Sequence, residues 1–484
     1  MSLSISRRNF LEMAAGAAVT SKVSRTQSSG GAGKRPNILF MLGDDHRWDA
    51  LGCRGNQIIQ TPQLDRLARE GVLFENHFCT TPICCASRAS IMLSQYAGTN
   101  GIYDFKTPLS PKQVEQTYWG QLKQAGYSIG FIGKFGVGDT MPSEPFDYWK
   151  GFSGQGQYFP QGPGGPHLTY IMRDQANEFF ESVPRDRPFC LSISFKAPHV
   201  QDEDPEQYLP SADTLALYQG VTIPPPSGAG QEDIRRFPPA IQHSESRRRW
   251  GVRFATPDLY QASVKGYYRL ISGTDNAIGS MRETLARLGL AENTIIVYSA
   301  DHGIFNGEHG LAGKWYGHEE SIRIPLVVYD PRLPAHMRGQ RRHAMTLNID
   351  LHPTVLEWAN LKPSASAQGR SLVPLLTRDN PNGRQVWFIE HHFPDGGWIP
   401  SSEGIRTTRW KYLRYTDSAA PFEELYDLDH DPHETDNLAG QAAYAHEQRI
   451  LTGYWRRWKD SLREGSDNWQ EPVTAEDLQR DGLS

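Results

Sequence analysis

Residues 38–45 read Ile38-Leu39-Phe40-Met41-Leu42-Gly43-Asp44-Asp45, an unbroken apolar run that ends on a glycine and two acidic residues. A strand inside a parallel sheet is apolar at nearly every position, because helices cover both of its faces. Later runs of the same kind alternate with amphipathic stretches, and they occupy residues 127–132, 188–195, 294–299 and 324–329. The pattern predicts an α/β fold with a large, mostly parallel sheet flanked by helices.

Polar residues follow these runs directly. Asp44 and Asp45 come after the first run, Lys134 after the second, His199 after the third and Asp301 after the fourth. Open α/β sheets place their binding sites at the carboxyl ends of the strands. We therefore expect these five side chains to meet in one functional site.

Two helices and one insertion are indicated between the runs. Thr61 as N-cap and Pro62 in the first turn mark a short helix, and residues 257–288 indicate a long one. Prolines and the cluster Arg247-Arg248-Arg249 interrupt the pattern between residues 201 and 255. We interpret this segment as a surface insertion, which either borders a substrate cleft or is a solvated loop without a role.

The composition changes after residue 376 toward Asn, Gly and Pro. Short aromatic strands at 385–389 and 410–415 and an amphipathic helix at 442–462 follow, so a small C-terminal α+β unit is expected. The chain is thus predicted to have three parts: a signal peptide with a linker at 1–34, a main domain at 35–376 and a C-terminal subdomain at 377–484.

The first twenty residues have the form of an export signal. Ser6-Arg7-Arg8-Asn9-Phe10-Leu11 precedes a short apolar stretch at residues 13–19, which is typical of a twin-arginine signal. This predicts a bacterial protein that the twin-arginine machinery exports to the periplasm or the medium. The apolar stretch is far shorter than the roughly 20 residues that span a bilayer, so no permanent membrane span is expected. The alternative is a basic N-terminus without a targeting role.

The overall composition excludes some classes of partner. The net charge is −5 with 22% charged residues, so the basic excess that nucleic-acid binding needs is absent. An odd number of cysteines argues against a disulfide scaffold. The five cysteines are Cys53, Cys79, Cys84, Cys85 and Cys190.

The pentapeptide Cys84-Cys85-Ala86-Ser87-Arg88 has the form Cys-x-Pro/Ala-x-Arg, and further motifs accompany it along the chain. These motifs are Gly43-Asp44-Asp45, Gly133-Lys134, Ser194-Phe195-Lys196-Ala197-Pro198-His199, Ser299-Ala300-Asp301-His302-Gly303, Gly313-Lys314 with Glu319, and Glu423-Glu424-Leu425-Tyr426-Asp427-Leu428 with Asp431-Pro432 and Asn437-Leu438. In this order they resemble the type I, formylglycine-dependent sulfatases of the alkaline-phosphatase-like superfamily. The resemblance implies a large mixed, mostly parallel sheet between helices, with a small C-terminal α+β subdomain.

The resemblance makes Cys84 the nucleophile precursor. In that family a maturase oxidises the cysteine of the pentapeptide to formylglycine, and Cys84, not Cys85, has the required spacing to Arg88. The hydrated aldehyde carries two hydroxyls on one carbon: one attacks sulfur, and the other then loses its proton so that sulfate is expelled. Arg88 would orient the formylglycine. The alternative is that Cys84 is a buried structural thiol.

The acidic pairs imply a metal centre. By the resemblance Asp44, Asp45, Asp301 and His302 hold one divalent cation together with the formylglycine at position 84. Oxygen-rich ligation favours Ca²⁺, with Mg²⁺ as the other candidate. The alternative, in which the acidic pair only caps a helix, does not explain the second acidic motif.

Three further residues receive catalytic roles from the resemblance. Lys134 and Lys314 would bind sulfate oxygens and neutralise charge in the transition state. His199 would contact the sulfate or protonate the leaving alkoxide, since histidine titrates in the required range. For each residue the alternative is an ordinary surface or structural role.

Two positions depart from the common family pattern. Ala86 stands where many members have proline, which leaves the type of maturase open. Gly136 stands where many members place a histidine that works on the geminal diol. His46 and His309 are candidates for that function, or for a supporting role behind the site.

The predicted function is the hydrolysis of O-sulfate esters, with sulfated carbohydrates as substrates. Trp398 and the pair His391-His392 lie in a segment that would border the cleft, where aromatic faces stack on sugars. One alternative is a phosphonate or phosphate ester hydrolase of the same superfamily. Another is an inactive binding protein on this scaffold, which the intact pentapeptide and acidic motifs argue against.

Overall fold

The computed structural model describes residues 35–378, 383–394, 396, 398–417, 422–464 and 469–483. The chain divides into the units Met1–Lys34 and Arg35–Ser484. The predicted twin-arginine signal and linker lie outside the described residues. Among the helices in the described ranges, none has the length and apolar character needed to cross a bilayer.

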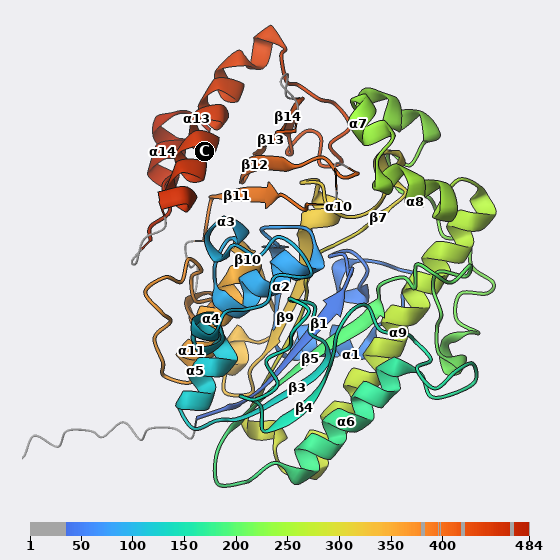
Figure 1. Cartoon of the computed structure of the whole chain (residues 1–484), viewed down its shortest axis with the longest axis vertical. Helices are drawn as coiled ribbons and strands as arrows, with labels where there is room; N and C mark the ends of the chain where they lie inside the picture. Colours follow the sequence, from blue (N-terminus) through green and yellow to red (C-terminus); the bar gives the residue numbers. More distant parts are fainter. Residues whose placement is uncertain are drawn as a thin grey trace, which may run out of the picture. The chain divides into compact units, whose positions relative to one another are not determined.

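An eight-stranded sheet forms the core of the unit Arg35–Ser484 (Figure 1). Its order is β10-β2-β9-β6-β1-β5-β3-β4, and β9 runs antiparallel to both of its neighbours while the other neighbouring pairs are parallel. The predicted mixed, mostly parallel sheet is therefore confirmed. The strands are β1 (Asn37–Asp44), β2 (Val72–Phe78), β3 (Ser128–Lys134), β4 (Tyr148–Phe152), β5 (Phe189–Pro198), β6 (Thr294–Ala300), β9 (Arg323–Tyr329) and β10 (Gln340–Leu347).

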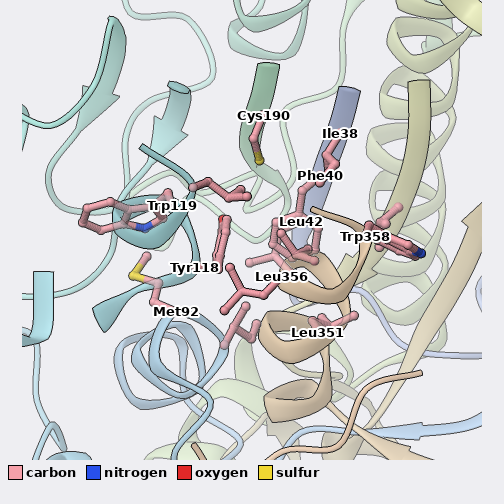
Figure 2. Packing of buried hydrophobic residues seen from close by; sticks show 14 of the residues in the cluster. Ile38, Phe40, Leu42, Met92, Tyr118, Trp119, Cys190, Leu351, Leu356 and Trp358 are labelled. Carbon is pink, nitrogen blue, oxygen red and sulfur yellow. The ribbon is translucent and has the colours of Figure 1, made fainter. Parts of the chain in front are cut away.

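β1 is buried along its whole length because helices cover both of its faces. Ile38, Phe40 and Leu42 pack into one helical layer, as Figure 2 shows, and Leu39 and Met41 pack into the other. Burial of each such side chain contributes about 1.5–3 kcal/mol. The first layer contains α2 (Cys84–Leu93), α5 (Tyr118–Gln124) and α11 (Leu351–Trp358), and the second contains α1 (Pro62–Glu70), α6 (Leu168–Ser182) and α9 (Pro257–Arg287).

The register of the central strands aligns their carboxyl ends. Leu42 pairs with Ser194 of β5, and Gly43 pairs with Ala300 of β6. Gly133 of β3 pairs with the same Ser194. The residues that end or follow these strands therefore emerge at one edge of the sheet, where the chemistry described below is located.

The start of α1 differs from the prediction. Thr61 precedes the helix as expected, but its side chain does not cap it. Instead the carboxylate of Asp275, on α9, accepts hydrogen bonds from the backbone N–H groups of Gln63 and Leu64 at 3.0 and 2.7 Å. The Thr61 hydroxyl donates to Asp65 at 3.1 Å. A residue more than 200 positions away thus satisfies the free donors of this helix end.

A second, antiparallel sheet follows in the C-terminal part, in the order β11-β12-β13-β14. The predicted α+β character of this part is confirmed, and the expected final helix is α13, which packs on the sheet. The boundary at residue 376 stays a prediction. These elements are β11 (Val386–His391), β12 (Ser402–Thr407), β13 (Trp410–Tyr415), β14 (Glu423–Asp427), α13 (Ala445–Glu464) and α14 (Ala475–Arg480).

The shorter elements connect these layers. The 201–255 segment contains α7 and α8, so it is a partly helical insertion and not only a loop. A two-stranded ribbon of β7 and β8 lies between β6 and β9 in the chain. The bounds are α3 (Ala97–Asn100), α4 (Pro111–Gln116), α7 (Pro239–Gln242), α8 (Glu245–Arg253), α10 (Glu319–Ile322), α12 (Val373–Thr377), β7 (Phe305–Asn306) and β8 (Ala312–Gly313).

Glu390 on β11 gives this fold a pH-dependent stability. Its carboxyl is buried beside the backbone N–H of Gly98, and burial raises its pKa to about 7. The pKa of this carboxyl is higher in the folded state than in the unfolded state, where it is near 4.5. The protonated carboxyl therefore contributes its full stability to the fold below pH 4.5, and this contribution is lost as the pH rises through about 7. We expect Glu390→Gln to equal the wild type at pH 4 and to be more stable at pH 8 by about 1–3 kcal/mol.

Urea unfolding at a series of pH values measures this difference. The exposed residue Glu357 provides the matched control, because Glu357→Gln removes a carboxyl that is not buried. Parallel stability curves for Glu390→Gln and the wild type between pH 4 and 8 would contradict the assignment.

Candidate active site

Cys84 is the first residue of α2, at the end of the helix where backbone N–H groups have no partner within the helix. Its side chain is buried, and its Sγ atom lies 3.5 Å from Asp44 Oδ1 and 3.2 Å from His302 Nε2. The positive end of the helix dipole at this point favours negative charge. The thiol therefore occupies a place that suits an anionic reacting group.

A pocket of about 280 Å³ contains Cys84 in its lining. His199 and Lys314 also line it, so two of the predicted sulfate-binding residues face the same space as the thiol. Part of the remaining wall is aromatic and consists of Phe105, Trp315, Phe393 and Trp398.

Buried carboxylates surround the thiol. Asp44 ends β1 and Asp301 follows β6, while Asp45 adopts a left-handed backbone conformation with φ of 62°. Ligand atoms of Asp44, Cys84, Asp301 and His302 lie within 4.8 Å of one another, and those of Asp44, Asp45, Cys84 and His199 do so as well. The two groups share Asp44 and Cys84, and their carboxylate oxygens and imidazole nitrogens form a donor set that fits a hard divalent cation such as Ca²⁺ or Mg²⁺.

Basic residues pair with each of these carboxylates. Lys134 contacts Asp44, Lys314 Nζ lies 2.7 Å from Asp45 Oδ1, and Arg88 Nε lies 2.9 Å from Asp301 Oδ2. Burial alone would raise the pKa of Asp44, but the charges of Lys134 and Arg88 hold it well below its usual value. The Asp44 carboxylate is therefore ionised, as a metal ligand must be.

His302 lies between two of these carboxylates. Its Nδ1 is 3.2 Å from Asp45 Oδ1, and its Nε2 is 3.6 Å from Asp301 Oδ1. Burial lowers the pKa of this imidazole, but Asp301 and Cys84 raise it more strongly, to about 9. The position thus attracts positive charge, which again fits a cation site.

His199 presents one ring nitrogen to the site. Nδ1 donates to the backbone oxygen of Val200 at 2.6 Å, and Nε2 lies 3.6 Å from Asp45 Oδ2. Burial, with help from Lys314, lowers its pKa well below the usual value, so the ring is neutral and Nε2 carries no proton. Negative charge bound nearby would raise this pKa again.

A model of the sulfatase family matches residues 36–361, which is more than half of the chain. The chain belongs to the sulfatase family. Residues 307–459 of this sulfatase also match a model described as N-sulphoglucosamine sulphohydrolase, C-terminal. It is therefore a sulfuric ester hydrolase, from a family that generally uses a metal ion and formylglycine.

Known proteins resemble the sulfatase over most of its length. An N-acetylglucosamine-6-O-sulfatase of Bacteroides thetaiotaomicron is 29% identical and aligns with 91% of this chain and 89% of its own. An ulvan-active sulfatase of Formosa agariphila is 27% identical over 85% of this chain and 78% of its own. A solved structure in complex with its substrate D-glucosamine-2-N,6-O-disulfate is 27% identical, covers 90% of this chain and 100% of its own, and gives a TM-score of 0.76.

The absence of a histidine at position 136 has a steric reason in this sulfatase. Gly136 has φ of 73°, and a Cβ atom at this position would lie only 2.8 Å from Cδ of Arg88. A side chain here would displace the arginine that pairs with Asp44 and Asp301. The glycine and the position of Arg88 therefore belong together.

The two histidines considered in place of position 136 are held differently. His46 is buried, donates from Nε2 to the backbone oxygen of Ala50 at 3.1 Å and accepts at Nδ1 from the Tyr298 hydroxyl at 2.6 Å. Burial lowers its pKa to about 4, which favours a supporting role over proton transfer.

His309 is not among the residues that line the described pocket. Its Nδ1 accepts from Arg236, and its Nε2 lies 3.5 Å from Glu320. It belongs to a buried polar cluster together with His318, whose ring centroid lies 4.7 Å from its own.

The segment that contains His391, His392 and Trp398 lies only partly at the pocket. Trp398 lines it and is 62% exposed. His391 is instead the buried last residue of β11, and His392 binds Glu403 at 2.9 Å. Of these three residues, the structure places only Trp398 in the pocket lining.

The pocket also contains residues that sequence reasoning missed. Gln155 lines it, and its Oε1 accepts a hydrogen bond from Lys134 Nζ at 2.6 Å. Asp202 and Glu245 line it as well. None of the three lies in a recognised motif; the only signal was that Asp202 and Glu245 fall within the insertion expected to border the cleft.

Proposed function

We propose that this sulfatase hydrolyses O-sulfate esters of carbohydrates with a formylglycine generated from Cys84 and a divalent cation, Ca²⁺ or Mg²⁺. The observation that carries the proposal is the position of Cys84 Sγ, at the N-terminus of α2, beside the Asp44 carboxylate and in the lining of the pocket. The cation would be held by Asp44, Asp45, Asp301 and His302, which belong to two groups of ligand atoms that share Asp44 and Cys84.

The proposed formylglycine and the divalent cation would each supply a defined chemistry. A hydrated formylglycine would supply one hydroxyl for attack on sulfur and a second whose loss of a proton reforms the aldehyde and expels sulfate together with the first oxygen, while a bound cation would polarise a sulfate oxygen. The buried place of Cys84 between carboxylate and imidazole supports this, because polar groups are available to orient both hydroxyls. An inert structural thiol would instead be expected among apolar side chains.

The residues of this chain would perform the remaining tasks. Arg88 donates to Asp301, Ser194 and the backbone oxygen of Lys134, so it ties the helix of residue 84 to three strand ends. Lys134 and Lys314 would exchange part of their carboxylate contacts for sulfate oxygens, where their charge stabilises the transition state. His199 would deliver a proton to the leaving alkoxide from Nε2, after the bound sulfate has raised its pKa.

Carbohydrate is the substrate class that the pocket supports best. The relatives named above act on N-acetylglucosamine-6-O-sulfate or ulvan by their names, and the solved structure contains a sulfated glucosamine. Trp398 offers an exposed aromatic face of the kind on which sugar rings stack. The pocket volume of about 280 Å³ lies at the small end of the range for small-molecule sites, which suits one sugar ring.

The cellular context and the domain limits belong to the same proposal. We infer that residues 1–34 direct twin-arginine export to the periplasm or the medium, as the arginine pair and the short apolar stretch indicate. A maturase would act on Cys84, with Ala86 at the position that distinguishes maturase types. The catalytic domain would extend over 35–376 and the C-terminal subdomain over 377–484.

The test is a comparison of matured enzyme on three substrate classes: monosulfated methyl hexosides, 4-nitrophenyl sulfate, and 4-nitrophenyl phosphate with its phosphonate monoester. We expect the highest kcat/KM on a sulfated hexoside, measured by release of inorganic sulfate. Turnover of the phosphate or phosphonate esters with no turnover of any sulfate ester would overturn the proposal. Turnover of aryl sulfate alone would remove its carbohydrate part.

A further inference from the structure

Three residues of the 201–255 insertion, Asp202, Glu245 and Arg249, form a polar wall of the pocket. Asp202 comes shortly after β5, and Glu245 and Arg249 lie one turn apart on α8. Two contacts hold α8 in place: the Ser246 hydroxyl donates to the backbone oxygen of Ala312 at 2.7 Å, and the Glu245 backbone N–H donates to that of Trp398 at 3.1 Å. The wall is therefore attached both to the ribbon of β7 and β8 and to the segment after β11.

Arg249 is the one member of the cluster Arg247-Arg248-Arg249 that lines the described pocket. Its Nε lies 2.7 Å from Glu245 Oε1, and its Nη1 lies 3.1 Å from Asp202 Oδ1. The guanidinium carbon is 5.2 Å from the centroid of the Trp315 ring. Two carboxylates and a ring thus orient this guanidinium, which is only 16% exposed.

Two polar atoms of this wall make no hydrogen bond to another residue in the part of the chain that the structure describes. Asp202 Oδ1 is occupied, because Arg253 Nη2 lies 2.6 Å from it and Arg249 Nη1 3.1 Å from it. Asp202 Oδ2 accepts no hydrogen bond, and Arg249 Nη2 donates none, among the described residues. One free acceptor and one free donor are therefore left on adjacent side chains in the pocket lining.

The charge of the wall restricts what these two atoms bind. A second anionic group of a substrate would meet the carboxylates of Asp202 and Glu245 in the same wall, and Arg249 already pairs with both. An ammonium group would meet Arg249 and Arg253, which already pair with Asp202. A neutral hydroxyl fits, because it accepts one hydrogen bond and donates another.

We propose that Asp202 and Arg249 bind a free hydroxyl group of the sugar that carries the sulfate ester. The hydroxyl accepts from Arg249 Nη2 and donates to Asp202 Oδ2, while the sulfate lies at residue 84 and the ring stacks near Trp398. This inference rests on the proposed carbohydrate function and specifies it. The pair selects sugars by an uncharged hydroxyl, so an added sulfate at that hydroxyl blocks binding.

The experiment combines substrate and protein changes. The best-cleaved monosulfated methyl hexoside of the panel is compared with its monodeoxy analogues, in the wild type and in Arg249→Gln. We expect the wild type to lose about 10- to 100-fold in kcat/KM on one deoxy analogue, since hydrogen bonds to charged groups are involved. On the parent sugar, the kcat/KM of Arg249→Gln should be lower than that of the wild type by a similar factor. Removal of the same hydroxyl from the substrate should then lower the kcat/KM of the variant little further.

Two controls separate recognition from structure. On 4-nitrophenyl sulfate, which has no sugar hydroxyl, kcat/KM of Arg249→Gln should stay within about threefold of the wild type. Arg248→Gln changes an arginine of the same helix that is 59% exposed, and it should retain full activity on every substrate. Asp202→Asn is the second variant, and it should lose the same hydroxyl preference as Arg249→Gln.

The outcomes are distinguishable. Equal losses on aryl sulfate and hexoside in Arg249→Gln, or a wild type that tolerates every deoxy analogue, would overturn the hydroxyl pair and leave the carbohydrate function intact. A wild type that cleaves aryl sulfate and no sulfated hexoside would overturn both.

Discussion

Replacement of Cys84 by alanine is expected to reduce kcat/KM of this sulfatase by about 10⁴-fold or more, which is the usual cost of removing a nucleophile. The Sγ atom of Cys84 lies 3.5 Å from Asp44 Oδ1 and 3.2 Å from His302 Nε2, the groups that would activate the modified residue. No other thiol lines the described pocket, so none is placed to replace it. Turnover of 4-nitrophenyl sulfate by wild type and variant, each produced with a maturase, measures the loss.

Cys85 provides the matched control for this prediction. It is the next residue of the same helix and equally buried, but its Sγ lies 3.7 Å from the backbone oxygen of Tyr103 and not at the carboxylates. We expect Cys85→Ala to keep activity within a few-fold, and peptide mass analysis to find the conversion of thiol to aldehyde at Cys84 only. An active Cys84→Ala protein, or a modified Cys85, would contradict the assignment.

The positions of Asp44 and Asp301 were predictable because they depend on short-range signals. An apolar run such as residues 38–42 predicts a buried strand by itself, and parallel neighbours place their carboxyl ends together. The pairing of Gly43 with Ala300 brings the two aspartates to the same edge. For these residues, local pattern and a general rule of sheet architecture were sufficient.

Asp202, Arg249 and Gln155 were not predictable in this way. Asp202 and Arg249 meet only because α8 packs beside the ribbon of β7 and β8, and Gln155 reaches Lys134 from the segment after β4. The same reason explains α1, where Asp275 satisfies the helix end that was assigned to Thr61. Contacts between distant segments leave no periodic signal in one sequence.

The C-terminal part shows an intermediate case. The strand at 410–415 was predicted with its observed bounds, since the aromatic residues Trp410, Tyr412 and Tyr415 mark it locally. The buried position of His391 was not predicted, because it depends on where β11 ends. The strand runs through His391, and the segment that leads toward the pocket begins after it. A shift of two residues at a strand end thus separates a pocket residue from a core residue.

Removal of the divalent cation by a chelator is expected to abolish turnover, by about 10³-fold or more, and to leave the fold intact. Asp44, Asp45 and Asp301 each have a basic partner of their own, namely Lys134, Lys314 and Arg88. These ion pairs keep the buried carboxylates compensated when the cation is absent, so no uncompensated charge remains to drive unfolding. Chelation should therefore remove the activity and leave the protein folded in the thermal unfolding measurement.

The measurement is a titration of chelated enzyme with Ca²⁺ and with Mg²⁺, following aryl sulfate turnover and thermal unfolding in parallel. Asp45→Asn should lower the activity by a similar factor and weaken the response to added cation, because it removes one of the converging carboxylates. Asp174→Asn, an exposed carboxylate on α6, is the control and should behave as the wild type. Full activity after exhaustive chelation would refute the metal centre, whereas unfolding upon chelation would refute the compensating role of Lys134, Lys314 and Arg88. The two readouts therefore test separate parts of the same site: the converging carboxylates as ligands, and the basic residues as their partners.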